Sequence, residues 1–315
     1  MFSVVLVCLG TFQEYIMTNI AQLIRLGHTT IYVLTNAELF PYFDPFSEFI
    51  FLISVETLED PFHFAEKSCL DKEWRTGFWH YTSARFFVIH SFMEKYGVNN
   101  IIHIENDVVL YYNCDDVLTV PLLNSGRIHI PFDSYVRNIA SILYIPDAST
   151  FGQVLSHYDY SKNDMYNFSV IRDKTDLIDQ FPIFVEESDE RSGTSNEQSG
   201  TVKGTDVSDK RSGTTTSGTC VRERSFVSRG WSRFGKYIFD AAAIGQYIGG
   251  VDPRNCATDT RGFINETCVI KYNEEGTIVW KIENGIMKPF LRMKCEKEIP
   301  IFNLHIHSKQ LALYT

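Results

Sequence analysis

The chain has 315 residues, of which 44% are hydrophobic and 14% aromatic, so it can bury a substantial core and is not disordered as a whole. Its 29 Lys and Arg against 39 Asp and Glu give a net charge of −10. An acidic chain lacks the basic stripe that holds a nucleic-acid backbone or an anionic membrane surface, so the composition argues against both partners.

The cysteines and the N-terminus bear on the compartment. Seven cysteines are scattered without a Cys-x-x-Cys pair, which is typical of neither a disulfide framework nor a zinc ribbon and favours a reducing compartment. Residues 1–10 are apolar but lack the basic start and the cleavage site of a signal peptide, so we predict a buried first strand. No run of about 18 apolar residues occurs elsewhere. We therefore expect a cytoplasmic protein without an integral membrane segment.

The N-terminal residues predict a strand–helix–strand unit. Residues 2–8 are a continuous apolar run, typical of a strand buried on both faces. Apolar residues recur at helical spacing over 12–24, Gly27 suits a helix end, and residues 29–34 are again β-branched and apolar. Such a unit implies a parallel sheet with ligands at the carboxyl ends of its strands, where Asn36 lies.

Further elements follow along the chain. The apolar runs and helical periodicity predict strands at 49–55, 101–104, 127–131, 142–145 and 301–306, helices at 82–96, 147–157 and 239–247, and a hairpin of 269–272 with 278–282 whose turn is 274–276. This order predicts an α/β fold: a Rossmann-type, mostly parallel central sheet flanked by helices, with a small C-terminal antiparallel part.

Residues 186–219 interrupt the pattern. Of these 34 residues, 19 are Ser, Gly or Thr and 11 are charged, so the segment cannot bury enough surface to offset the cost of ordering it. We predict a disordered insertion within a single domain of residues 1–315, because the pattern after the segment is too short for a second core.

Two carboxylates follow a predicted buried strand directly. Glu105 and Asp107 are separated by one residue, and alternate residues project the same way, so both side chains can converge on one divalent cation. Hard oxygen ligands suit Mg²⁺ or Mn²⁺. The alternative is an acidic surface turn, but a solvated turn seldom lies between two apolar strands.

The C-terminal strand offers complementary groups. Alternation places His305 and His307 on one face, where an imidazole is a good further ligand for Mn²⁺, and Lys309 can meet phosphate oxygens as a point charge. The alternative is a polar strand face at a fraying terminus. The acidic pair and this His–Lys pair together predict one site for a metal ion and a diphosphate, since an acidic protein needs local positive charge to hold a diphosphate.

Asp240 and Asp252 flank a stretch of small residues that allows close approach to a ligand or a second backbone. Either carboxylate could contact sugar hydroxyls or act as general base toward an acceptor hydroxyl, whereas Asp240 could equally be a helix N-cap, and the two roles can coexist. An aromatic cluster ends at Arg85, which could touch phosphate, although core packing accounts for the aromatic residues as well.

Together these motifs resemble GT-A fold nucleotide-sugar glycosyltransferases, including uncharacterised glycosyltransferase-like proteins of bacteria, large DNA viruses and some eukaryotes. The resemblance rests on the strand–helix–strand start, on Glu-Asn-Asp in place of an Asp-x-Asp motif, and on residues 82–112, 239–252 (FDAAAIGQYIGGVD) and 303–309 (NLHIHSK). It covers most of the chain apart from residues 186–219 and the Phe-rich stretch near 40–70.

The resemblance implies a GT-A-like catalytic domain over residues 1–315 that uses Mn²⁺ (or Mg²⁺) to move a sugar from a nucleoside-diphosphate sugar, by family frequency a UDP-sugar, to a glycan or other hydroxyl acceptor. Glu in the first motif position is a departure, and its longer side chain favours Asp107 as the main metal ligand. The implied roles are metal binding for Glu105, Asp107 and His307 or His305, and donor binding for Asn36 (base), Glu105 (ribose) and Lys309 (diphosphate). The resemblance fixes no acceptor base, so Asp240 and then Asp252 are candidates from the residues alone, as Arg85 is for a phosphate contact.

Three other classes of function remain open. A His-x-His pair with a carboxylate also suits a metal-dependent hydrolase or oxygenase, although the usual oxygenase fold is all-β and this chain begins otherwise. A nucleotide-sugar-binding protein without catalysis would carry the same motifs. A structural or interaction protein that acts through residues 186–219, by short motifs or phosphorylation, is the third.

Overall fold

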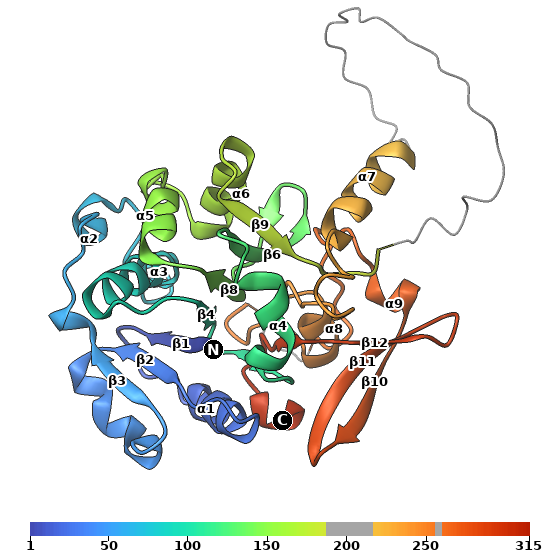
Figure 1. Cartoon of the computed structure of the whole chain (residues 1–315), viewed down its shortest axis with the longest axis horizontal. Helices are drawn as coiled ribbons and strands as arrows, with labels where there is room; N and C mark the ends of the chain where they lie inside the picture. The colour runs from blue at the N-terminus through green and yellow to red at the C-terminus, as the bar shows by residue number, and fades with distance from the viewer. Residues whose placement is uncertain (187–216, 256–259) are drawn as a thin grey trace, which may run out of the picture.

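A computed structural model describes residues 1–186, 217–255 and 260–315 (Figure 1). Residues 187–216, most of the predicted insertion, lie outside the described residues. At its two ends the structure differs from the prediction. Residues 217–219 begin helix α7 (Ser217–Ser228), whose last turn buries Val227, and the Glu186 carboxylate accepts a hydrogen bond from the backbone N–H of Gly230 at 2.6 Å.

The central sheet has the strand order β3-β2-β1-β4-β8-β6-β7, with β9 also paired to β6. Neighbours among the first four strands are parallel, β8 is antiparallel to both β4 and β6, and β9 is parallel to β6. The strands are β1 (Ser3–Cys8), β2 (Ile31–Thr35), β3 (Phe51–Ser54), β4 (Ile101–Ile104), β6 (Ile128–Ser134), β7 (Arg137–Asn138), β8 (Ile142–Ile145) and β9 (Ile178–Phe181). The predicted Rossmann-type sheet is therefore confirmed.

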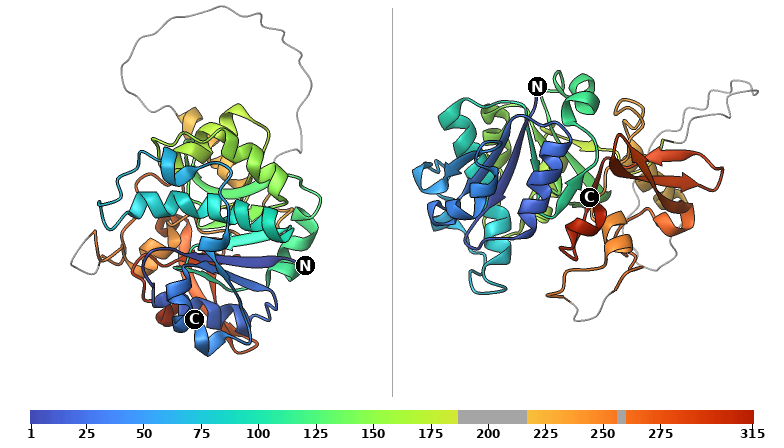
Figure 2. Two further views of the ribbon diagram at one scale, coloured as in Figure 1. Left: turned by 90° about the vertical axis from the view of Figure 1, so that its left-hand side faces the viewer. Right: turned by 90° about the horizontal axis from the view of Figure 1, so that it is seen from below.

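Helices cover both faces of this sheet, on opposite sides in Figure 2. Alternate residues of β1 explain the two layers, since Val4 and Leu6 join the core beneath one helical layer and Val5 and Val7 join the core beneath the other. The first layer holds α1 (Tyr15–Arg25) and α4 (Cys114–Leu122), and the second holds α3 (Phe78–Tyr96), α5 (Ala148–Ser156) and α6 (Asp164–Lys174).

The predicted C-terminal antiparallel part is present, but its hairpin is shifted along the chain. Residues 272–275 form helix α9 (Tyr272–Glu275), and the turn joins β10 (Gly276–Glu283) to β11 (Ile286–Met293) at Asn284-Gly285. The φ angles of these two residues are 53° and 76°, the left-handed values that a two-residue hairpin turn requires and that Asn-Gly adopts readily. The Asn-Gly pair was thus the stronger signal.

The remaining elements complete the chain. A second ladder pairs β13 (Asn303–His305) with β5 (Val108–Leu110), and β12 (Glu298–Pro300) pairs with β11. The short helices are α2 (Phe64–Lys67), α8 (Ile244–Gly249), and the 3₁₀ helices η1 (Ala37–Phe46), η2 (Val55–Thr57) and η3 (Leu311–Tyr314). No helix among the described residues has the length and apolar character needed to cross a bilayer.

Helix α8 begins later than the predicted 239–247 and lies against β13. Ala242, with a φ of 64°, is left-handed, so the backbone turns before the helix starts at Ile244. The contact depends on Gly245, because a Cβ there would overlap the carbonyl oxygen of His305 and lie 2.9 Å from Oδ2 of Asp240. The small residues of this stretch therefore serve backbone packing.

We predict that Gly245→Ala lowers the free energy of unfolding by about 1–3 kcal/mol, the usual cost of overpacking, and displaces His305. Thermal unfolding of the purified variant measures the effect. Gly249→Ala, in the same helix, is the matched control, since the nearest side-chain atom to its Cβ would be at 3.4 Å. Equal unfolding midpoints for the two variants would contradict the prediction.

Candidate functional site

The site lies where the central sheet meets the β5–β13 ladder. Glu105 and Asp107 follow the carboxyl end of β4, and β13 runs antiparallel beside β5, so that His305 pairs with Val108. The backbone N–H of Ile306 donates to the Asp107 carbonyl at 2.9 Å. This register brings the C-terminal imidazole beside the mid-chain carboxylates.

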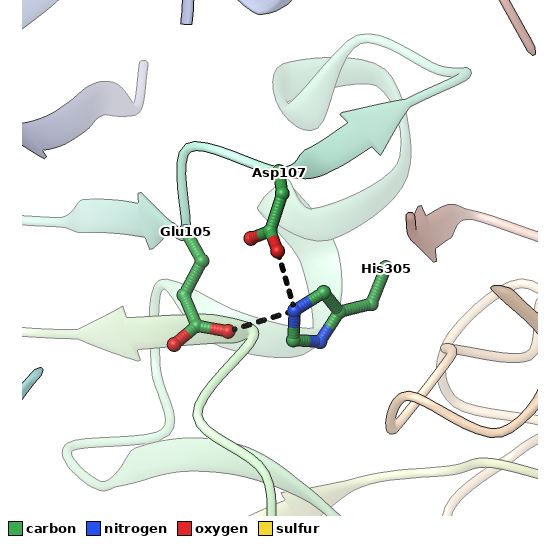
Figure 3. Close-up of side chains that lie close together, drawn as sticks. All are labelled: Glu105, Asp107 and His305. Carbon is green, nitrogen blue, oxygen red and sulfur yellow. Dashed lines mark hydrogen bonds and ion pairs between the residues drawn. The ribbon is translucent and has the colours of Figure 1, made fainter. Parts of the chain in front are cut away.

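Three of the predicted metal ligands converge (Figure 3). Nε2 of His305 lies 3.2 Å from Oε2 of Glu105 and 3.2 Å from Oδ2 of Asp107, and one candidate ligand atom from each residue lies within 4.8 Å of the others. Two carboxylate oxygens and one imidazole nitrogen are a donor set that fits Mn²⁺ and, through the oxygens, Mg²⁺.

Two cationic side chains also touch these carboxylates. Lys309 donates to Oδ2 of Asp107, and Arg85 donates from one terminal nitrogen to Oε1 of Glu105 and from the other to Oδ2 of Asp164 at 3.2 Å. The Arg85 side chain is only 9% exposed, so its charge is balanced by carboxylates and not by bulk water. Positive charge therefore meets the acidic pair from two sides.

The charges in this cluster reinforce one another. Burial disfavours the charged form of Asp107, but His305 and Lys309 outweigh burial and hold the pKa of its carboxyl well below the ordinary value. Burial likewise disfavours the imidazolium of His305, yet Asp107 and Glu105 raise the pKa of this histidine above its usual value. The acidic pair therefore creates a site that favours a cation.

Two cavities meet at the cluster. The first, of about 440 Å³, extends from the carboxyl end of β1 past the start of α1, and the second, of about 400 Å³, extends toward β7 and α8. Both are lined by Arg75, Phe78, Thr82, Glu105, Asp252 and Lys309. The carboxylate of Glu105 and the ammonium of Lys309 thus stand at the border between two separate spaces, where two ligands can meet.

His307 does not join the three converging ligands. Its Nδ1 lies 2.9 Å from the amide nitrogen of Gln246, a donor, so the ring proton of the neutral imidazole is on Nε2. Burial first, and then the neighbouring His305, lower the pKa of His307 well below its ordinary value. A site with both histidines on one ion, as the hydrolase and oxygenase alternatives require, is not what the geometry favours.

Asn36 lines neither cavity. Its Oδ1 accepts a hydrogen bond from the backbone N–H of Gly10 at 2.9 Å, and its Nδ2 donates to Oε1 of Glu56 at 2.8 Å. The amide therefore ties together the loops that follow β1, β2 and β3. The predicted contact of Asn36 with a nucleotide base stays a prediction, and the hydrogen bonds observed here serve the loops.

Asp240 caps the start of α8, as the sequence left open, although it lies three residues before the N-cap residue Ala243. Its carboxylate accepts hydrogen bonds from the backbone N–H groups of Ala243, Ile244 and Gly245 at 2.8–2.9 Å and from that of His305 at 3.0 Å. The side chain is fully buried and lines neither cavity. We therefore correct the prediction of a general base, because every lone-pair direction of this carboxylate is committed to the backbone.

Asp252 reaches both cavities, but its carboxylate is engaged. Arg254 donates from Nε and a terminal nitrogen to it, the shortest contact being 2.7 Å. Burial raises its pKa in principle, yet these hydrogen bonds hold the pKa of Asp252 below the ordinary value. A carboxylate this well stabilised as an anion is a weak proton acceptor, so its predicted role as base loses support.

Two buried groups at the site were missed in the sequence. Asp164, the first residue of α6, is 4% exposed and lines the second cavity, and burial raises its pKa to about 6 despite Arg85. His103, inside β4, lines the first cavity, and burial together with Arg85 lowers its pKa to about 3. The sequence could have indicated His103, because a histidine inside an otherwise apolar strand is unusual. It could not have indicated Asp164, because an acidic residue in the first turn of a helix is common.

Comparisons with known proteins were made with the whole chain. No family model matches it, and no curated protein matches it. The solved structures that match include glycosyltransferases, a putative glucose-1-phosphate thymidylyltransferase and a cytidylyltransferase.

Mouse xyloside xylosyltransferase 1 matches with a TM-score of 0.41 and 10% identity over 57% of this chain and 85% of its own. The glycosyltransferase GlyE of Streptococcus pneumoniae has 0.40 and 14% over 57% and 46%, so this chain spans less than half of GlyE. The galactosyltransferase LgtC has 0.39 and 11% over 57% and 73%. The likeness is distant, and no activity or substrate of this chain follows from it.

We predict that Asp240→Ala lowers the free energy of unfolding by about 2–5 kcal/mol, because several buried N–H groups lose their acceptor at once. Asp147→Ala is the matched control. Asp147 caps α5 through one N–H of Thr150 at 2.7 Å, and such a cap is worth about 1 kcal/mol. Chemical denaturation of both variants measures the difference. A stably folded Asp240→Ala that loses only turnover would instead indicate a catalytic base.

Proposed function

We propose that this chain is a metal-dependent glycosyltransferase, which moves a sugar from a nucleoside-diphosphate sugar to a hydroxyl acceptor. The observation that carries the proposal is the convergence of Glu105, Asp107, His305 and Lys309 at the border of two cavities. Group transfer between two substrates needs two adjoining binding spaces and a means of stabilising the leaving group where they meet.

The first cavity suits the donor. Its volume of about 440 Å³ lies in the usual range for small-molecule sites, and Arg75, Arg254 and Lys309 are among its lining residues. Phe12 and Tyr15, at the start of α1, add aromatic surface for a nucleoside. Cationic and aromatic side chains together match a diphosphate joined to a nucleoside, and the family resemblance favours UDP.

Glu105, Asp107 and His305 are the residues that would hold Mn²⁺ or Mg²⁺, and Lys309 and Arg85 supply positive charge to the two carboxylates. A bound divalent ion supplies Lewis-acid stabilisation of the negative charge that develops on the diphosphate. Lys309 adds a second positive charge toward the phosphate oxygens. Arg85 keeps Glu105 oriented from the opposite side.

The second cavity suits the acceptor. Trp74 and Trp79 line it with parallel rings whose centroids are 6.1 Å apart, and aromatic faces are good surfaces for sugar rings. Asp164 adds a buried carboxylate beside Arg85, which can accept hydrogen bonds from hydroxyl groups of the transferred sugar or the acceptor. Trp74 is 40% exposed, so the second cavity reaches solvent at this ring and a larger acceptor can extend past it.

Nucleotide binding tests the proposal directly. We expect Mn²⁺ to increase the thermal stabilisation by one of UDP, GDP or ADP, because a ligand at 100 times its dissociation constant contributes about 2.7 kcal/mol. We expect Asp107→Asn to lose this increase, and a chelator to abolish it in the unsubstituted protein. Asp173→Asn, at an exposed carboxylate on α6 that pairs with Arg172, is the control. No stabilisation of the unsubstituted protein by any nucleotide would overturn the proposal.

Asp164→Asn separates transfer from donor binding. We expect kcat/KM for sugar transfer to fall by about 10- to 100-fold, the effect of losing a hydrogen bond to a charged group, with Mn²⁺-dependent binding of the nucleoside diphosphate unchanged. Asp159→Asn, in an exposed turn with Ser161, is the matched control. Unchanged transfer by Asp164→Asn would show that this carboxylate only balances Arg85.

A further inference from the structure

Three buried polar atoms, which belong to residues that line the first cavity, have no hydrogen-bond partner among the described residues. They are Nε of Arg85, Nε2 of His103 and Oδ1 of Asn106. These residues are only 7%, 1% and 7% exposed. Buried polar atoms in folded proteins are nearly always satisfied, so unpaired atoms gathered at one cavity point to a ligand or water that pairs with them.

The polarity of two of these atoms is fixed. Nδ1 of His103 lies 2.9 Å from the carbonyl oxygen of Val5, which can only accept, so in the neutral imidazole Nδ1 carries the proton and Nε2 is an acceptor. The guanidinium of Arg85 is always protonated, so its Nε–H is a donor. Since Oδ1 of Asn106 is also an acceptor, the residues that line the cavity present two unmet acceptors and one unmet donor.

The two residues also lie near each other and near the metal-binding cluster. His103 lies in β4 and Glu105 follows this strand directly, two positions further on, and Arg85 donates to the Glu105 carboxylate. The ring of His103 stands edge-on to Phe86, with centroids 6.3 Å apart, so apolar surface lies on its other side. A group that enters here meets Arg85 and His103 together.

A hydroxyl is the group that satisfies both atoms, since it accepts from one neighbour and donates to another. We propose that a hydroxyl of the donor substrate binds between Arg85 and His103, accepting from Nε–H of the arginine and donating to Nε2 of the histidine. This inference rests on the proposed function, and it makes His103 a residue that determines donor specificity. The hydroxyl can belong to the ribose or to the transferred sugar.

Calorimetric titration at pH 8 with Mn²⁺ tests the proposal, using UDP and UDP-glucose as probes. We expect His103→Phe, which keeps a ring but removes the acceptor, to weaken binding by about 10- to 100-fold, because a site built around a hydroxyl discriminates strongly against its loss. Equal weakening of both probes assigns the hydroxyl to the ribose. Weakening of UDP-glucose alone assigns it to the sugar.

His28→Phe is the matched control. His28 is also a buried histidine, 7% exposed with an unpartnered Nε2, but it lines neither cavity, so we expect this substitution to leave both affinities unchanged. Binding of deoxygenated ligands to the unsubstituted protein provides a second test, which does not require the variant to fold. The 2′-deoxy or 3′-deoxy form of UDP, or UDP-2-deoxyglucose, should bind the unsubstituted protein about as weakly as the parent ligand binds His103→Phe.

The outcomes separate this inference from the function on which it rests. Absence of binding of UDP, GDP and ADP to the unsubstituted protein overturns the proposed function and this inference with it. If GDP or ADP binds in place of UDP, that nucleotide and its glucose conjugate replace the two probes. Normal binding by the unsubstituted protein and equal binding by His103→Phe overturns this inference alone, and shows that water pairs with Nε2. The same conclusion follows if none of the deoxygenated ligands loses affinity.

Discussion

The pairing of β13 with β5 is the constraint on which the candidate site depends. It carries His305 to Asp107, a residue 198 positions earlier, and no local feature of either segment could bring them together. The strand is held in turn by Asp240, whose carboxylate accepts the N–H of His305, and by the glycine that lets α8 approach. Asp240, which the sequence suggested as a catalytic base, therefore holds in place the strand that carries His305.

The buried carboxylates of the candidate site are balanced by nearby cationic side chains. The chain carries a net charge of −10, yet around the acidic pair it gathers Arg85, Lys309 and a histidine with a raised pKa. Buried carboxylates are expensive unless they are paired, and here each has a cation on it. The carboxylates and their cations lie where the two cavities meet. Both charges are therefore available to the proposed metal ion and diphosphate.

Local sequence patterns predicted which polar residues lie near the site better than they predicted what those residues contact. Asn36 follows a strand end, where ligands bind in open α/β sheets, but the loops there have backbone and carboxylate groups that need partners as well. Asp240 precedes a helix, and the need to satisfy four buried N–H groups outweighs any role toward solvent. The roles of Asp164 and His103 depend on neighbours that are distant in the sequence, such as Arg85.

The sequence by itself determined the strand–helix–strand start, most of the strands and helices, and the acidic pair that follows β4, because apolar periodicity and composition are local properties. It also placed a histidine and a lysine near the C-terminus for the same site. Only the tertiary structure decided that His305 and not His307 faces the carboxylates, and that Arg85 bridges Glu105 and Asp164. Those choices depend on strand register and on which side chains pack together, and both are set by contacts between segments far apart in the chain.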